Sequence, residues 1–135
     1  MPVVVVDAST VVAALIDSGP DGRWAEEILV AGPLAAPHLM PAEVANILRR
    51  AALAGRISAD AASLAHADLA QLRVELFPYE PFTDRIWALR ANVTSYDAWY
   101  VALAEFLVCP LATLDARLAG APGLKCEVRL PGVRT

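Results

Sequence analysis

The chain has little charge and almost no lysine. Charged residues make up 19% of its 135 residues and hydrophobic residues 57%, and Lys125 is the only lysine among eleven basic residues. The formal net charge is −4. Phosphate contacts normally require a basic surface, so this balance argues at first against a nucleic-acid partner. The apolar composition suggests that part of the surface is covered, by a second copy of the chain or by another protein.

Long apolar runs and cysteines are also scarce. No uninterrupted run approaches the roughly 18 residues that would indicate a membrane span, because Asp7 and Asp17 interrupt the N-terminal stretch. The first basic residue is Arg23, which argues against a signal peptide and predicts a cytoplasmic protein with no membrane attachment. Cys109 and Cys126 have neither a metal-ligand spacing nor the density of a disulfide scaffold, so we expect buried free thiols.

The sequence does contain a regular alternation of strand and helix patterns. Predicted strands cover residues 3–6, 34–37, 74–77, 110–115 and 127–130, and predicted helices cover about 9–16, 21–30, 41–55, 58–72, 83–91, 95–108 and 116–119. We expect Asp7 or Ser9 to cap the first helix, with Ser58 and Ser95 capping two later ones. Without a linker or repeat, residues 1–135 predict a single three-layer α/β/α domain with a central parallel sheet of four to five strands.

Four carboxylates stand where an apolar element ends or a helix begins: Asp7, Glu43, Asp97 and Asp115. Asp7 and Asp115 follow predicted strands, and the carboxyl ends of parallel strands form the edge of a sheet where ligands bind. Each residue alone has an ordinary explanation, as a helix cap or as compensation of a helix dipole. Their joint occurrence instead predicts a metal site, because carboxylates crowded at one edge repel each other unless cations separate them.

Such a site would reverse the argument from net charge. Two divalent cations would contribute four positive charges and make the site attract phosphate. Arginines could then guide a polyanion towards it, and the sequence offers Arg49, Arg50, Arg56, Arg85, Arg90 and Arg117. Asn46 and Arg50 share a helix face with Glu43, at spacings of three and seven residues. With Arg117, they are the residues that we single out as possible RNA contacts.

Four segments in order resemble a known family: VVDAS at 5–9, PAEVAN at 41–46, SYDAWYVALA at 95–104 and LATLDARL at 111–118. They are similar to PIN domains and, more narrowly, to the VapC toxins of bacterial type II toxin-antitoxin operons. The resemblance implies that Asp7, Glu43, Asp97 and Asp115 bind metal and that the hydroxyls of Ser9 and Thr113 support them. It also implies a homodimer that is held inactive by a cognate VapB-type antitoxin.

The residue types suit the chemistry that this resemblance implies. Mg²⁺ and Mn²⁺ prefer hard oxygen ligands, so one or two of these ions fit a carboxylate cluster better than zinc does, and His38 and His66 are not expected ligands. Bound cations can support attack of water on a phosphodiester without a side-chain nucleophile. The hypothesis is an endoribonuclease that inhibits translation by cutting tRNA, rRNA or mRNA. Asp7 and Asp97 would be the principal ligands, and Glu43 would bind metal or orient the attacking water.

Alternatives from other classes remain open at this point. A phosphotransfer receiver domain also places aspartates at strand ends, but Asp7 has no acidic neighbour and Lys125 is poorly placed for that chemistry. An inactive PIN module that only binds a partner, or a PIN nuclease for RNA maturation, would keep the same sequence pattern. Trp24, Trp99 and Tyr100 are candidates for burial or an interface, with core packing expected for Trp99.

Overall fold

A five-stranded parallel sheet lies at the centre of the protein in the computed structural model, which describes residues 2–132. Its strands are β1 (Val4–Val6), β2 (Leu34–Pro37), β3 (Glu75–Phe77), β4 (Leu111–Ala112) and β5 (Val128–Arg129). The strand order is β3-β2-β1-β4-β5, and every neighbouring pair is parallel. The predicted α/β class and parallel sheet are therefore confirmed, with five strands.

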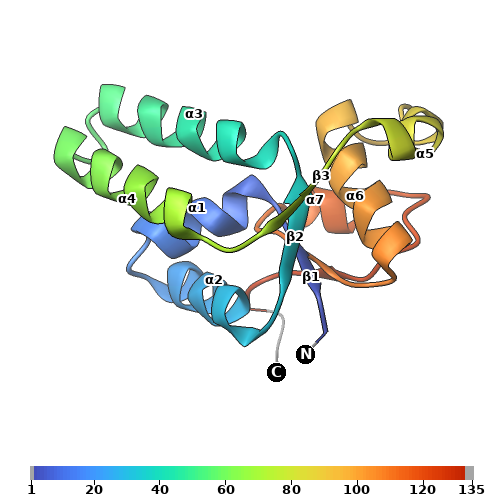
Figure 1. The fold of residues 1–135 in the computed structure, drawn as a ribbon, viewed down its shortest axis with the longest axis horizontal. Helices are drawn as coiled ribbons and strands as arrows, with labels where there is room; N and C mark the ends of the chain where they lie inside the picture. The colour runs from blue at the N-terminus through green and yellow to red at the C-terminus, as the bar shows by residue number, and fades with distance from the viewer. Residues whose placement is uncertain (1, 133–135) are drawn as a thin grey trace.

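Helices cover both faces of this sheet (Figure 1). They are α1 (Ala8–Ile16), α2 (Pro20–Ala31), α3 (Met40–Leu53), α4 (Ala59–Gln71), the 3-10 turn η1 (Glu80–Phe82), α5 (Thr83–Ala88), α6 (Ser95–Leu107) and α7 (Ala116–Ala119). Helix α6 packs on β1, β2 and β4, while α1 and α2 lie across the sheet from it. Helices α3 and α4 run side by side and both contact α1. None of the helices among residues 2–132 is long and apolar enough to span a membrane.

The strand order reverses direction beside β1. The chain moves outwards from β1 to β2 and β3, then returns through α5 and α6 to add β4 on the other side of β1. In such doubly wound sheets, the connections leave β1 and β4 on opposite faces and open a crevice at their carboxyl ends. Asp7 follows β1 and Asp115 lies three residues after β4, so both belong to this crevice.

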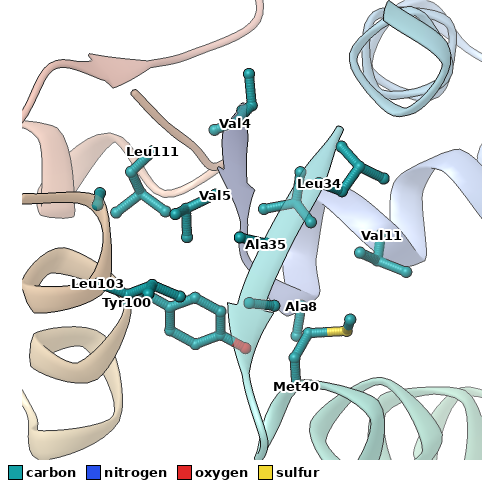
Figure 2. Close-up of a cluster of buried hydrophobic side chains, with 14 of the residues drawn as sticks. Val4, Val5, Ala8, Val11, Leu34, Ala35, Met40, Tyr100, Leu103 and Leu111 are labelled. Carbon is teal, nitrogen blue, oxygen red and sulfur yellow. The ribbon is translucent and has the colours of Figure 1, made fainter. Parts of the chain in front are cut away.

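Apolar residues from the sheet and from the helices on both of its faces form the core (Figure 2). Val5 and Leu111 are fully buried, as expected for strands with a helix layer on each face. Tyr100 is buried and reaches from α6 across the strand ends towards Met40 (Figure 2). Trp24 is buried too, whereas Trp99 is partly buried and packs against the core, so the expected core role of Trp99 is confirmed.

Several local predictions are corrected by the structure. Thr94, not Ser95, caps α6, because Thr94 is extended and its hydroxyl accepts the Asp97 N–H, whereas Ser95 is already helical. Strand β4 ends at Ala112, and a side-chain hydrogen bond of Thr113 organises the residues that follow it. Helix α5 ends at Ala88, and the chain after it forms turns. The two cysteines are free but only half-buried, and burial raises the pKa of Cys126 to about 11, which keeps this thiol protonated.

Candidate metal centre

Asp7 is held rigidly between β1 and α1. Its Oδ1 accepts hydrogen bonds from the Thr10 N–H (3.0 Å) and the Ser9 hydroxyl (2.7 Å), so Asp7 caps α1 while Ser9 supports the same oxygen. The hydroxyl of Thr113, which follows β4, donates to Oδ2. Oδ1 is therefore fully engaged by two donors, and Oδ2 retains one lone pair that could bind a cation.

Burial raises the pKa of Asp7, against the lowering effect of its hydrogen bonds from Thr113, Ser9 and Thr10. The carboxylate is 9% exposed and has no cationic side chain among its hydrogen-bond partners within residues 2–132. A buried carboxylate without a counter-charge is costly unless a cation accompanies it. Asp7 is thus a residue whose surroundings favour either a proton or a bound metal.

Glu43 enters the crevice from the first turn of α3. The phenol of Tyr100 donates a hydrogen bond to Glu43 Oε1, which links α3 to α6 across the strand ends. Burial raises the pKa of Glu43, and the negative charges of Asp7 and Asp97 raise it further, although the Tyr100 hydrogen bond lowers it. Burial and the Glu43 contact also raise the pKa of Tyr100, so the phenol stays neutral and acts as the donor.

Asp97 and Asp115 form the other side of the crevice. Asp97 lies in the first turn of α6, and its pKa is raised by burial and then by the charges of Asp115 and Asp7. Asp115 caps α7 by accepting the Arg117 N–H (2.9 Å) at Oδ1, and its own N–H donates to the Thr113 hydroxyl (3.0 Å). Thr113 therefore contacts both Asp7 and the backbone of Asp115.

The structure gathers all four predicted carboxylates at one edge of the sheet. The pKa of Glu43 responds to Asp7 and Asp97, and the pKa of Asp97 responds to Asp7 and Asp115. Within residues 2–132, however, no three His, Cys, Asp or Glu side chains are close enough to hold one metal ion by themselves. The arrangement suits Mg²⁺ or Mn²⁺, because Mg²⁺ usually binds through one or two carboxylates and keeps several waters.

The basic and polar residues that were predicted to contact RNA do not all lie beside the four carboxylates. Arg117 lies beside Asp115, with Nε 3.6 Å from Oδ1, and its side chain is exposed. Asn46 and Arg50 are exposed on α3 and do not line the pocket beside Asp97 and Asp115. Arg85 was expected to guide a polyanion, and this prediction is wrong: its guanidinium is bound to both carboxylate oxygens of Glu105 and to the Gly123 carbonyl.

Sequence reasoning missed three polar side chains around the carboxylates. Tyr100 positions Glu43, Thr94 caps the helix that presents Asp97, and Thr10 donates from its buried hydroxyl to the Ala112 carbonyl. Tyr100 stands three residues after Asp97, so the shared helix face was a usable signal. The roles of Thr94 and Thr10 depend on contacts that the linear pattern does not contain.

The parallel sheet adds strands on both sides of β1, and carboxylates gather at the carboxyl ends of β1 and β4. This arrangement defines the chain as a doubly wound α/β domain with an acidic edge. Comparison with known families gives a match to the PIN domain over residues 4–124. The chain belongs to the PIN domain family.

Similar proteins cover nearly the whole chain. Ribonuclease VapC1 of Mycobacterium tuberculosis is 46% identical over 127 residues, which are 93% of this chain and 96% of the relative. Ribonuclease VapC9 of the same species is 40% identical over 125 residues, covering 93% and 95%. Among solved structures, PAE2754 from Pyrobaculum aerophilum matches with a TM-score of 0.71 at 25% identity, covering 94% of this chain and 83% of that one. M. tuberculosis VapC20 has the same fold, with a TM-score of 0.67 at 16% identity, covering 90% and 95%.

Proposed function

We propose that this protein is a metal-dependent endoribonuclease and that it acts as the toxin of a toxin-antitoxin pair. The observation that supports the chemistry is the acidic edge. There, burial raises the pKa of Asp7, Glu43 and Asp97, and neighbouring negative charge adds to the effect for Glu43 and Asp97. RNA as the substrate is supported by the two ribonucleases that are 46% and 40% identical to this chain.

One or two Mg²⁺ or Mn²⁺ ions fit the oxygen donors at this edge. Asp7, through the open lone pair of Oδ2, and Asp97 would be the principal ligands, with Asp115 and Glu43 completing the site together with water. When bound, such ions supply the Lewis acidity and charge shielding that phosphodiester hydrolysis requires.

The protein side chains would orient the reacting groups. Ser9 and Thr113 hold Asp7 in one rotamer, and Thr113 also fixes the backbone at Asp115. Tyr100 directs the Glu43 carboxylate into the crevice, where it could orient the attacking water or accept its proton. The raised pKa of Glu43 makes its carboxylate a better proton acceptor than an exposed glutamate.

RNA would reach the crevice through basic and polar residues at its margin. Arg117 is the best placed of these, because it is exposed and adjoins Asp115. Asn46 and Arg50, on the same helix as Glu43, remain possible RNA contacts. Asp97→Asn should preserve the fold and abolish cleavage, because it removes the charge of one principal ligand with little change in volume.

The experiment that tests this function is cleavage of transfer RNAs, ribosomal RNA and messenger RNA by purified, antitoxin-free protein with Mg²⁺ or Mn²⁺. We expect discrete cuts that disappear with EDTA and in Asp97→Asn. If no RNA is cut and neither ion binds measurably, the proposal fails and an inactive PIN binding module explains the chain better.

A toxin role predicts cytoplasmic activity and specific partners. We expect a homodimer in solution, and a VapB-type antitoxin that places a basic side chain among the four carboxylates. Growth arrest on expression, relieved by co-expression of a small neighbouring gene, would support this role. RNA cleavage without growth arrest would instead indicate a nuclease for RNA maturation.

A further inference from the structure

A pocket of about 530 Å³ adjoins the acidic edge. It lies between the turn that follows α5, residues 90–94, and the region of α7, residues 115–121. Asp97 and Asp115 line it, so the pocket is continuous with the candidate metal centre. Its volume falls in the lower half of the roughly 300–1,000 Å³ range of small-ligand sites, which suits one nucleotide.

Two guanidinium groups bring positive charge to this otherwise acidic region. Arg90 and Arg117 both line the pocket. Arg90 is already positioned: its Cζ lies 4.7 Å from the centre of the Trp87 ring, and its Nη1 donates to the Trp87 carbonyl (2.8 Å). A preorganised side chain loses little conformational freedom when it binds a ligand. Trp87 is thus a positioning residue for Arg90.

The rest of the pocket is largely apolar and is held together across two segments. Val93 and Ala121, both partly exposed, contribute apolar surface. The Asn92 side-chain amide donates to the Pro122 carbonyl (3.0 Å) and so joins the turn after α5 to the segment after α7. Apolar surface beside the positioned Arg90 guanidinium matches the way in which proteins hold unstacked bases and phosphates of single-stranded RNA.

We propose that this pocket binds the nucleotide adjacent to the scissile phosphate of a single-stranded RNA segment. Arg90 and Arg117 contact its phosphate or stack on its base, and Val93 and Ala121 contact its base. The inference rests on the proposed ribonuclease function and adds a specificity site on one side of the cut. Residues that vary the shape of this pocket would then select the base at that position.

Binding can be tested separately from cleavage, with the four nucleoside 5′-monophosphates as probes. Each is titrated up to about 20 mM into ¹⁵N-labelled protein with Mg²⁺, because a monophosphate has no phosphodiester bond to cleave and the cation offsets the charge of Asp97 and Asp115 beside the pocket. Saturable shifts are expected at the Trp87 indole, the Asn92 side-chain amide and the backbone of residues 91–94. Unequal affinities for the four bases would identify the preferred nucleotide.

Two variants examine the pocket, and a third serves as a control. Arg90→Ala should weaken binding about tenfold, the loss typical of one charge-assisted hydrogen bond. Ala121→Phe keeps every charge and should block the pocket, because Ala121 lines it. Arg73→Ala removes an equal charge from an exposed residue before β3, at the opposite edge of the sheet, and should change nothing.

Cleavage kinetics distinguish a failure of this inference from a failure of the proposed function. In an active enzyme, Arg90→Ala should raise KM with kcat nearly unchanged, whereas Asp97→Asn should abolish turnover. Absent shifts, shifts outside the pocket, or equal affinity in wild type and Arg90→Ala would each overturn the nucleotide site even if RNA is cut. Pocket binding without any RNA cleavage would overturn the ribonuclease proposal and, with it, the assignment of the pocket to a substrate.

Discussion

Thr113 donates a hydrogen bond to Asp7 and thereby joins the ends of β1 and β4, which are 106 residues apart in the sequence. The same hydroxyl accepts the N–H of Asp115 (3.0 Å). Thr113 is completely buried, so water cannot replace either hydrogen bond. One side chain therefore sets the relative position of two of the four carboxylates.

Replacing Thr113 by valine tests this positioning role. Thr113→Val keeps the volume but leaves Asp7 with one donor fewer and the Asp115 N–H without its acceptor, so stability should fall by about 1–3 kcal/mol. Metal affinity and cleavage should fall about 10- to 100-fold, as when a metal ligand loses its supporting partner. Calorimetric titration of Mn²⁺ and RNA cleavage would measure these effects. Thr83→Val is the control, since the Thr83 hydroxyl is exposed and bonds the Glu80 carbonyl rather than a carboxylate of the site.

The acidic edge should make the metal-free protein less stable as pH rises. The pKa values of Asp7, Glu43 and Asp97 are raised in the folded state, so the folded state holds protons that the unfolded state has already lost. Stability should therefore decline from the ordinary carboxyl pKa near 4 up through the raised pKa values. Thermal unfolding in EDTA between pH 4 and pH 7 would measure this decline. The assignment would be contradicted if stability rose with pH across this interval and rose at least as steeply in wild type as in Asp97→Asn.

Asp97→Asn should have opposite effects on stability with and without metal. In EDTA at pH 7 it removes one of the repelling charges near Glu43 and Asp115, so its Tm should exceed that of wild type. With Mg²⁺ or Mn²⁺, wild type should gain stability through ligand linkage and the variant should gain much less. Thermal melts of wild type and Asp97→Asn, each in EDTA and with metal, would measure both effects. Equal gains in both proteins would show that Asp97 is not a principal ligand.

The ion pair between Arg85 and Glu105 should stabilise the C-terminal region of the fold. Arg85 Nε and Nη2 bind Glu105 at 2.7 and 3.0 Å, and Glu105 also accepts the Lys125 N–H (2.8 Å). Burial alone would raise the pKa of Glu105, but the hydrogen bonds from Arg85 and from the Lys125 N–H together lower it overall. Arg85→Met should cost about 2 kcal/mol, because it leaves a mostly buried carboxylate without its charged partner.

Urea unfolding would measure this cost, and a second ion pair supplies the control. Arg129 and Glu127 form a pair at 3.1 Å in which both side chains are well exposed. Arg129→Met should therefore change stability by about 0.5 kcal/mol or less. Equal losses of stability in Arg85→Met and Arg129→Met would show that burial does not make the first ion pair more stabilising than the second.

Val108 is a further position where substitution should raise stability. It ends α6 with a φ of 53°, a left-handed conformation that β-branched residues adopt only with strain, and its side chain is 90% exposed. Val108→Gly should therefore stabilise the protein by about 1 kcal/mol, because glycine relieves the strain without loss of packing. Val30→Gly, at an exposed position inside α2, should instead lower stability. Thermal or urea unfolding would measure whether stability rises in Val108→Gly and falls in Val30→Gly.

The sequence predicted the parts of this protein that local chemistry decides. Apolar β-branched runs, helix periodicity and turn residues indicated the order of strands and helices, with the boundaries of most elements shifted by a few residues. The four carboxylates could be named because each one directly follows a strand or begins a helix. Arg85 was misjudged because an unpaired arginine and one bound to a distant glutamate look identical in sequence.

Tertiary structure decided which of these local features act together. The return of the chain beside β1 places Thr113 against Asp7 and Asp115 near Asp97. The packing of α6 on the strand ends brings Tyr100 to Glu43. The pocket beside Asp97 likewise exists only because the turn after α5 meets the segment after α7. Hydrogen bonds, burial and charge repulsion depend on distances between atoms, and chain topology sets those distances for residues that are far apart in the sequence.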